Sequence, residues 1–273
     1  VEELGGSNPM LRRIRRLARD RGSRWAEASY VVEGPTLVTE AIEAGLDVEQ
    51  VLVPASAASH SVVGTAETAG VPCVLVADRI FGALTTTRTS QPALAEVTCH
   101  DVPLADLVAT QGTALILAGV SDPGNAGTLV RSAEAFGAAG VVFVNGVDPY
   151  NPKAVRAAAG STFRVPIAIP PGKDPVWEVV DTFGAAGYQV LAAVTNGGLI
   201  PEEVIRDRPL ALVVGSEPHG LNDSLVEVCD TRVSLPTDGG GDSLNVAVAG
   251  SVLLYALRRV PVGDPPENGA PGA

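Results

Sequence analysis

The sequence of 273 residues contains few cysteines, and they are far apart. Cys73, Cys99 and Cys229 form no CxxC pair, and only Cys99 has a histidine beside it. A disulfide-stapled scaffold needs an even set of cysteines, and a structural zinc site needs about four ligands. The sequence therefore predicts neither a disulfide framework nor a metal site.

Aromatic residues and long apolar runs are also scarce. Phe, Trp and Tyr make up 4% of the chain and hydrophobic residues 46%, so the core must consist mainly of Ala, Val and Leu. Such a core favours packed helices and strands over an aromatic-rich β-sandwich. No apolar run reaches the roughly 18 residues of a membrane helix, and the N-terminal segment is rich in arginine where a secretory signal would be apolar. We therefore expect a cytoplasmic protein with no membrane partner.

Lysine is almost absent, and the basic charge is concentrated in one segment. The net charge is −12, yet 17 of the 19 basic residues are arginines, and seven of these lie between positions 12 and 24. Leu11, Ile14 and Leu17 recur among them, which is typical of a helix with one apolar stripe and a basic face. We expect this face to bind phosphates in a salt-sensitive manner; the alternative is a solvated face without a ligand. The seven are Arg12, Arg13, Arg15, Arg16, Arg19, Arg21 and Arg24.

The hydrophobic pattern divides the chain into two α/β units. The first comprises residues 1–105, with strands expected at 30–34, 48–53, 72–76 and 93–98. Residues 106–112 are predicted to be a linker because they mix polar and apolar residues and end in a glycine. The Pro- and Gly-rich residues 263–273 are predicted to be a disordered tail.

The second unit, residues 113–262, alternates continuous apolar runs with helical segments. Its strands are expected at 114–120, 140–144, 188–194, 210–214 and 232–235. Helices are expected to end at 137 and to span 152–159, 176–186, 222–229 and 243–259. This order predicts a parallel sheet with helices on both faces. Because helix 243–259 is apolar on nearly all sides, we expect it to be covered within the domain or by a second subunit.

Glycines and polar residues gather in the loops after three strands of the second unit, where open α/β sheets bind ligands. In order, the segments are Asn125-x-Gly127-x-x-x-Arg131, Gly215-x-Glu217-x-x-Gly220-Leu221 and Leu235-Pro236-x-x-Gly239-x-x-x-Ser243-Leu244-Asn245-Val246. Arg131 lies in an otherwise apolar helix and needs either an anionic partner or an outward face. A salt bridge to Glu134 or another acid is the purely structural alternative.

Together, these segments resemble the three motifs of the SpoU/TrmH-type RNA ribose 2′-O-methyltransferases of the SPOUT superfamily. The resemblance covers residues 113–260 and includes the segment 151–166, which begins Asn151-Pro152-Lys153-x-Val155-Arg156. Thr237 stands where the family usually has Met, and Ala247 where it often has Ser. The N-terminal unit, with its arginine-rich start and the segment 31–41, is similar to the substrate-binding domain of ribosomal-RNA members.

The resemblance implies an α/β fold in which a parallel-sheet domain with a deep trefoil knot follows a small α/β sandwich. It also implies a homodimer that uses S-adenosylmethionine to methylate a ribose 2′-hydroxyl of RNA. The N-terminal unit favours 23S ribosomal RNA over transfer RNA. The implied cofactor-binding residues are Asn196, Gly215, Leu235 and Leu244. The implied catalytic residues are Arg131, Asn125, Glu217, Ser243 and Asn245. The residues expected to contact RNA are Arg12, Arg13, Arg15, Arg16, Arg19, Lys153 and Arg156.

The chemistry of arginine suggests which role Arg131 has. A guanidinium stays protonated in proteins, so we expect Arg131 to hold a phosphate and stabilise the forming alkoxide, with the proton passing to phosphate or water. Two alternative functional classes remain. One is a nucleotide-dependent oxidoreductase, against which the sequence shows no GxGxxG after the first strand of the second unit. The other is a non-catalytic RNA-binding protein, which would bind no cofactor.

Overall fold

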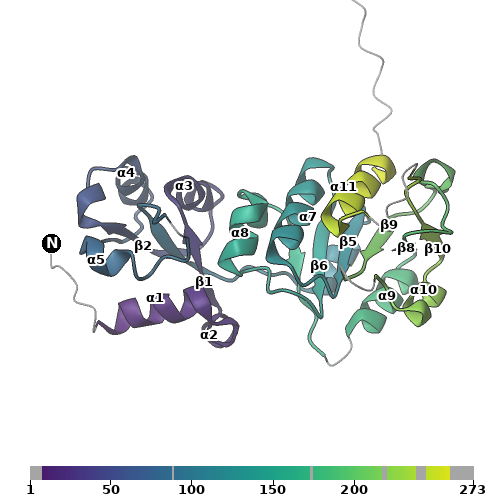
Figure 1. Cartoon of the computed structure of the whole chain (residues 1–273), viewed down its shortest axis with the longest axis horizontal. Helices are drawn as coiled ribbons and strands as arrows, with labels where there is room; N and C mark the ends of the chain where they lie inside the picture. The colour runs from purple at the N-terminus through teal and green to yellow at the C-terminus, as the bar shows by residue number, and fades with distance from the viewer. Residues whose placement is uncertain (1–7, 88, 173–174, 217–219, 238–243, 259–273) are drawn as a thin grey trace, which may run out of the picture.

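Two β-sheets organise the chain, and each has hydrophobic clusters on both of its faces. The computed structural model describes residues 8–87, 89–172, 175–216, 220–237 and 244–258. Figure 1 shows the two sheets in separate domains placed side by side, with α8 next to the domain that contains β1. The predicted two-domain α/β architecture is confirmed.

The N-terminal domain contains a four-stranded mixed sheet in the order β1-β4-β2-β3. β4 is antiparallel to β1 and β2, and β3 is parallel to β2. The strands are β1 (Ser29–Glu33), β2 (Val48–Pro54), β3 (Cys73–Val76) and β4 (Leu94–Thr98). The helices are α1 (Pro9–Arg19), α2 (Arg21–Glu27), α3 (Pro35–Glu43), α4 (Ser61–Thr68) and α5 (Asp78–Phe81), with a 3₁₀ turn η1 (Ala55–Ala57). α1 and α5 pack in one hydrophobic cluster of this sheet, and α3 and α4 in the other, so the small sandwich is confirmed.

The basic segment forms two helices, so the expectation that one helix carries all seven arginines is wrong. Asp20 has an extended backbone, and its carboxylate accepts a hydrogen bond from the backbone N–H of Ser23 at 2.6 Å. Such a residue ends one helix and caps the next. The apolar stripe of α1 is confirmed, since Leu11, Ile14 and Leu17 are buried. The break places Arg21 and Arg24 on α2, apart from the arginines of α1.

The C-terminal domain contains a six-stranded, entirely parallel sheet in the order β10-β8-β9-β5-β6-β7. The strands are β5 (Ala114–Ala118), β6 (Gly140–Val144), β7 (Ile167–Ala168), β8 (Gln189–Ala193), β9 (Leu210–Val214) and β10 (Thr231–Val233). The helices are α7 (Pro123–Ala135), α8 (Pro152–Ala158), α9 (Pro175–Ala185), α10 (Asp223–Val228) and α11 (Val246–Leu257), with 3₁₀ turns η2 (Ser161–Phe163) and η3 (Pro201–Glu203). The predicted strands are confirmed, and β7 is an additional two-residue edge strand.

The expected linker contains most of a helix, α6 (Leu104–Ala109). Leu107 and Val108 of this helix are buried in the core of the C-terminal domain, and the Tyr188 hydroxyl donates a hydrogen bond to the Val108 carbonyl at 2.9 Å. Residues 106–112 therefore form part of the second domain's packing and are more than a connection.

The last described helix, α11, is covered on one side only. Leu253, Leu254 and Leu257 are buried, whereas Val248, Val252 and Tyr255 are 50%, 43% and 52% exposed. The single chain therefore leaves an apolar face of α11 in solvent. No helix in the described ranges is long and apolar enough to cross a membrane.

Polar and aromatic contacts join the two domains. The Arg24 Nε donates a hydrogen bond to the Asp148 Oδ2 at 2.6 Å, and both side chains are almost fully buried. The Tyr30 and Tyr150 rings lie 4.6 Å apart between centroids. Arg164 also pairs across the junction with Glu40 at 3.0 Å. These contacts fix the arginine-rich helices relative to the parallel sheet.

Candidate functional site

Four chain segments at the carboxyl edge of the parallel sheet contact one another in two pairs. The loop after β5 contacts the loop after β9, because a Cβ on Gly119 would lie 3.7 Å from the Ser216 Cβ. The chain after β8 pairs with the chain after β10, where the Ser234 N–H donates to the Leu199 carbonyl at 3.0 Å. The structure thus brings together the strand ends that the sequence singled out, where open α/β sheets bind ligands.

Gly215 is required by a close approach of two backbone segments. Ser216 and Gly220 exchange backbone hydrogen bonds of 3.3 and 3.0 Å, which closes a narrow turn after β9. A Cβ on Gly215 would collide with the backbone of Gly220 and Leu221. Gly215 therefore lets the backbone of Gly220 and Leu221 pack against the end of β9, at the edge where open α/β sheets bind ligands.

Asn125 and Asn245 are in contact although 120 positions separate them in the sequence. The Asn245 Oδ1 accepts hydrogen bonds from the backbone N–H groups of Ala247 and Val248 at 2.9 and 3.2 Å, so Asn245 caps α11. Its Nδ2 then donates to the Asn125 Oδ1 at 3.1 Å. Because the cap fixes the orientation of the Asn245 amide, the first and third motifs are joined by an oriented hydrogen bond.

Arg131 is an exposed residue of α7, and packing on two sides fixes this helix. A Cβ on Gly127 would lie 2.6 Å from the Ala157 Cβ of α8, and one on Gly250 of α11 would lie 2.6 Å from the Leu129 Cδ2. Gly127, the motif glycine, thus serves helix packing. The Ser132 and Ser251 hydroxyls also share a hydrogen bond of 2.6 Å between α7 and α11.

Asp122 caps the start of α7 and holds Lys153. Its Oδ1 accepts a hydrogen bond from the Asn125 N–H at 2.9 Å, and its Oδ2 lies 3.0 Å from the Lys153 ammonium. The hydrogen bond from the Asn125 N–H lowers the pKa of Asp122 most, and the hydrogen bond from Lys153 lowers it further. The first motif therefore begins with an ionised cap that orients Asn125 and places a lysine beside it.

The other predicted residues of this site differ in exposure and in location. Asn196 is exposed in the loop after β8, Leu235 packs partly against the core, and Leu244 is 45% exposed before α11. Glu217 and Ser243 lie outside the described residues. Arg156 pairs with the buried Glu33 of the other domain at 3.0 Å, so it belongs to the domain junction as well as to the predicted RNA surface.

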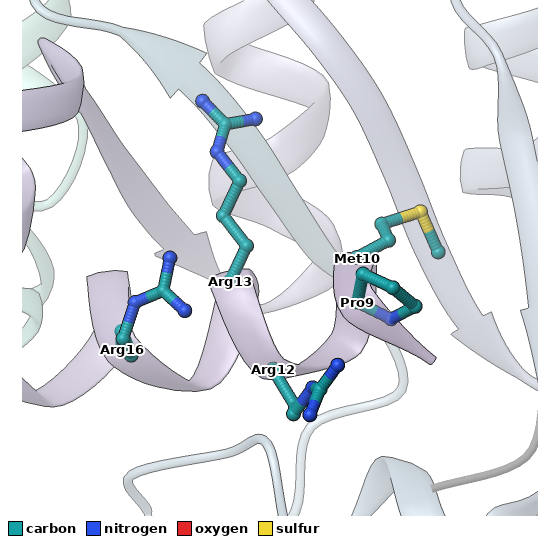
Figure 2. A pocket seen from close by; sticks show the side chains of 5 residues that line it. All are labelled: Pro9, Met10, Arg12, Arg13 and Arg16. Carbon is teal, nitrogen blue, oxygen red and sulfur yellow. The ribbon is translucent and has the colours of Figure 1, made fainter. Parts of the chain in front are cut away.

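A basic cavity of about 450 Å³ lies at the start of α1. Pro9, Met10, Arg12, Arg13 and Arg16 line it (Figure 2). Arg12, Arg15, Arg16 and Arg19 are exposed, so their guanidinium groups are accessible to a polyanion. This surface contains all five α1 arginines that were predicted to contact RNA.

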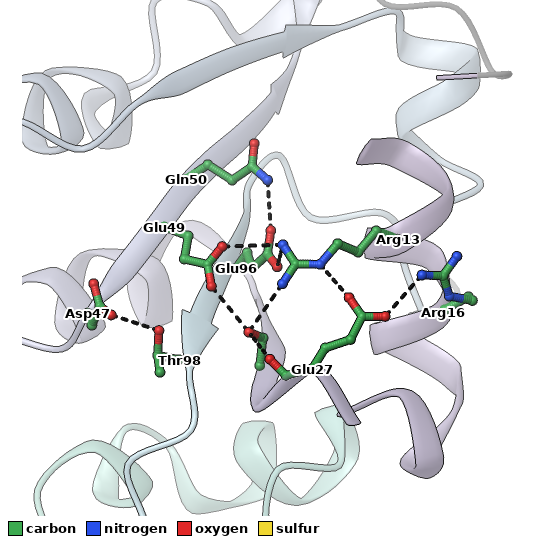
Figure 3. Close-up of polar contacts among 9 residues, drawn as sticks. Arg13, Arg16, Glu27, Asp47, Glu49, Gln50, Glu96 and Thr98 are labelled. Atoms are coloured by element: carbon green, nitrogen blue, oxygen red, sulfur yellow. Dashed lines mark hydrogen bonds and ion pairs between the residues drawn. The ribbon is translucent and has the colours of Figure 1, made fainter. Parts of the chain in front are cut away.

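Arg13 differs from its neighbours because three glutamates surround it (Figure 3). It pairs with Glu27, with Glu49 at 3.3 Å and with the fully buried Glu96 at 2.5 Å. The hydrogen bonds from Arg13 and Arg16 lower the pKa of Glu27, whereas burial raises the pKa of Glu96. Arg13 thus attaches α1 to the sheet, a role that the sequence pattern did not indicate because its acidic partners are distant in sequence.

Comparisons with known proteins match both domains. The profile of the SpoU rRNA Methylase family matches residues 112–255, and that of the MRM3-like substrate binding domain matches residues 8–95. The 23S rRNA (guanosine(2553)-2′-O)-methyltransferase RlmP of Bacillus subtilis is 34% identical over 231 residues, which cover 84% of this chain and 88% of that protein. The 23S rRNA (uridine(2479)-2′-O)-methyltransferase of Streptomyces viridochromogenes is 34% identical over 142 residues, which cover 51% of this chain and 50% of that protein.

Several solved structures match nearly the whole chain, and two of them contain AdoMet. One is an AdoMet-bound rRNA methyltransferase from Sinorhizobium meliloti, with a TM-score of 0.82 and 27% identity, covering 94% of this chain and 97% of that one. The other is the SpoU methyltransferase AviRb from Streptomyces viridochromogenes in complex with AdoMet, with a TM-score of 0.81 and 25% identity, covering 92% and 97%.

Proposed function

This chain belongs to the SpoU rRNA methylase family, and from that premise we propose that it methylates a ribose 2′-hydroxyl of 23S ribosomal RNA. It is an S-adenosylmethionine-dependent RNA methyltransferase. The observation that carries the assignment is the hydrogen bond between Asn125 and Asn245, which joins two family motifs at the carboxyl edge of the sheet. A transfer RNA substrate, which also occurs in the family, is the second candidate.

The carboxyl edge fits the cofactor. Adenosine needs backbone donors and acceptors together with apolar walls. Gly215 supplies backbone groups at the end of β9, and Leu235 and Leu244 supply apolar side chains. We assign the cofactor to these three residues and to Asn196. When bound, S-adenosylmethionine supplies a methyl group on a positively charged sulfur. The trefoil knot implied by the motifs belongs to this proposal, with the chain after β9 and β10 threaded around the cofactor.

The chain's own residues position the ribose and stabilise charge. Bound S-adenosylmethionine would give its methyl group to the 2′-oxygen and leave as S-adenosylhomocysteine, so this chain's residues would have to hold the ribose in line for that transfer. Arg131 holds the adjacent phosphate and stabilises the developing alkoxide, and the hydroxyl proton passes to phosphate or water. Asn125 and Asn245, together with Glu217 and Ser243, orient Arg131 and the ribose.

The N-terminal domain supplies the RNA-binding surface. Arg12, Arg15, Arg16 and Arg19 are exposed on α1, and Lys153 lies beside the first motif. Arg13 and Arg156 complete the set, although both also pair with glutamates. Because these cations bind RNA through its phosphates, RNA affinity is expected to fall as the salt concentration rises. A ribosomal RNA substrate also places the enzyme in the cytoplasm.

The proposed function is tested with S-adenosylmethionine, an unmodified 23S rRNA transcript and bulk transfer RNA. We expect calorimetry to show cofactor binding and labelled methyl groups to enter only the 23S transcript, at a site that resists alkaline cleavage. Labelled transfer RNA would support the second candidate. Cofactor binding without transfer to either RNA would refute the substrate assignment, and RNA binding without cofactor binding would favour a non-catalytic RNA-binding protein.

We also propose that two copies associate through the outer face of α11. Val248, Val252 and Tyr255 recur at intervals of four and three residues, so they form one stripe of α11, and Leu244 lies just before the helix. Each of the four is at least 43% exposed. A soluble monomer seldom exposes a continuous apolar stripe of this kind. Its position next to the Asn245 cap places the active site near the interface, as the family resemblance implies.

Val252→Glu is expected to convert the dimer into a monomer, because a charge in an apolar interface loses its hydration. Light scattering after gel filtration measures the mass, which falls from twice 27.8 kDa to 27.8 kDa. Val228→Glu is the matched control, since Val228 of α10 is 54% exposed on a different helix. A dimer that persists in Val252→Glu, or a monomeric wild type, would contradict the proposed interface.

A further inference from the structure

A cavity of about 410 Å³ lies between the two domains, at the carboxyl ends of β6 and β7. Its size falls within the roughly 300–1,000 Å³ of small-molecule sites. β5 separates this part of the sheet from β9, β8 and β10, where the cofactor is assigned. The cavity is therefore a different place from the proposed methyl-transfer site. Its lining includes Arg21, Phe143, Asn145, Gly146, Ile169 and Pro171.

The lining combines a cation, an amide and apolar walls. The Arg21 Nη1 donates a hydrogen bond to the Gly146 carbonyl at 3.1 Å, which places this exposed guanidinium at the cavity. Asn145 is exposed with φ 52°, a left-handed conformation that asparagine tolerates. Its side chain forms no hydrogen bond with any other described residue. Proline residues also line the cavity and restrict its shape before a ligand arrives.

These groups match the parts of one nucleotide. The guanidinium suits a phosphate, the amide suits the polar edge of a base, and the apolar walls suit the faces of a base or ribose. Trp25 lies beside Arg21, with the guanidinium carbon 5.9 Å from the ring centroid, and it is 38% exposed. An exposed aromatic ring next to a basic group is a platform on which an unpaired base stacks.

The cavity adjoins both the basic helices and the first motif. Arg21 begins α2, directly after the arginines of α1. On the other side, the Val147 N–H donates to the Val120 carbonyl at 2.9 Å, and the Gly119 N–H donates to the Val144 carbonyl at 2.8 Å. The cavity wall therefore packs against the loop that leads into α7. The cavity is therefore bordered by Arg21 of α2 on one side and, on the other, by the loop that leads into α7, the helix of Arg131.

We propose that this cavity binds one unpaired nucleotide of the substrate RNA, close in sequence to the methylated nucleotide. The assignment rests on the proposed function, because it takes RNA as the substrate. Arg21 binds a phosphate of that nucleotide, and Asn145 contacts its base. The cavity thereby helps the enzyme to select a single-stranded site whose target ribose reaches Arg131.

Two substitutions remove these contacts without straining the backbone. Arg21→Gln removes the charge, and Asn145→Gly removes the amide at a position whose positive φ glycine adopts readily. With the unmodified 23S rRNA transcript, we expect each variant to raise the KM for RNA about five-fold or more and Arg21→Gln to reduce the salt dependence of RNA affinity by about one phosphate contact. The Kd for S-adenosylmethionine stays at the wild-type value, because its site uses other strands.

Arg208→Gln is the matched control. Arg208 is exposed and precedes β9, so it lies at the opposite edge of the parallel sheet. If Arg21→Gln and Asn145→Gly both methylate RNA with the KM of this control, the cavity binds no part of the substrate and the inference is wrong. If the wild type methylates no RNA, the proposed function itself fails. In the expected case, 4-thiouridine in the transcript also crosslinks to residues 143–149.

Discussion

Replacing Arg131 by alanine is expected to lower kcat on the order of 10²–10³-fold, because the variant loses a cation that faces charge forming in the transition state. Arg131→Lys is expected to keep partial activity with weaker RNA affinity. Lysine retains the charge but lacks the planar pair of donors that matches a phosphate. Rates are measured with the 23S transcript at saturating S-adenosylmethionine, so that a change in cofactor affinity does not contribute.

The structure explains why this substitution leaves the fold in place. Arg131 is exposed, whereas the contacts that fix α7 come from Gly127, Leu129 and Ser132. A normal Kd for S-adenosylmethionine in Arg131→Ala shows that the site is intact, and Arg208→Ala gives the effect of losing an exposed arginine elsewhere. Turnover of Arg131→Ala at the level of Arg208→Ala would exclude an essential role for Arg131.

The sequence was most informative where apolar runs are continuous. β5, β6 and β9 are buried on both faces, and their bounds lie within two residues of those predicted. β7 escaped prediction because a strand of two residues has no detectable period. α6 escaped because a six-residue helix after a proline resembles a loop. The burial of its Leu107 and Val108 and the hydrogen bond from the Tyr188 hydroxyl to the Val108 carbonyl stabilise it.

The candidate site was predictable in composition but not in geometry. The motifs identified Asn125 and Asn245, yet spacing alone gives no reason for residues 120 positions apart to share a hydrogen bond. That contact depends on the packing of α11 against α7, because β10 and β5 are not neighbours in the sheet. The role of Gly127 was likewise hidden, because its neighbour Ala157 belongs to another helix.

The arginine cluster shows the limit of reading charge from sequence. Arg12 and Arg13 are adjacent, but Arg12 is exposed whereas Arg13 contacts Glu27, Glu49 and Glu96. Glu49 lies on β2 and Glu96 on β4, and both strands are distant from α1 in sequence. Arg24 is the extreme case, since it is 3% exposed at the domain junction. The partners of each arginine therefore decide which members of a run of like charges are exposed, which attach the helix to the sheet and which are buried.

Asp148→Asn is expected to destabilise the protein by about 3–5 kcal/mol, because it leaves the Arg24 guanidinium buried without its counterion. Arg24 and Asp148 are each 3% exposed, and the pair spans the two domains at 2.6 Å. The Asp148 Oδ1 also accepts a hydrogen bond from the Tyr150 N–H at 2.9 Å, which asparagine can retain. The expected loss therefore comes mainly from the unpaired charge.

Urea denaturation followed by tryptophan fluorescence measures this loss. Trp25 lies in the N-terminal domain and Trp177 in the C-terminal domain, and the chain contains no other tryptophan. Trp25→Phe and Trp177→Phe backgrounds therefore report the unfolding of each domain separately.

Lys153→Met is the control, because the Lys153–Asp122 pair has a similar distance of 3.0 Å but is 59% and 44% exposed, so its loss costs less than about 1 kcal/mol. Adding Arg24→Met to Asp148→Asn removes the unpaired charge and is expected to cost less than the two single changes together. If Asp148→Asn costs no more than Lys153→Met, the buried pair does not hold the domains together, and the position of α2 beside the parallel sheet must depend on its other contacts.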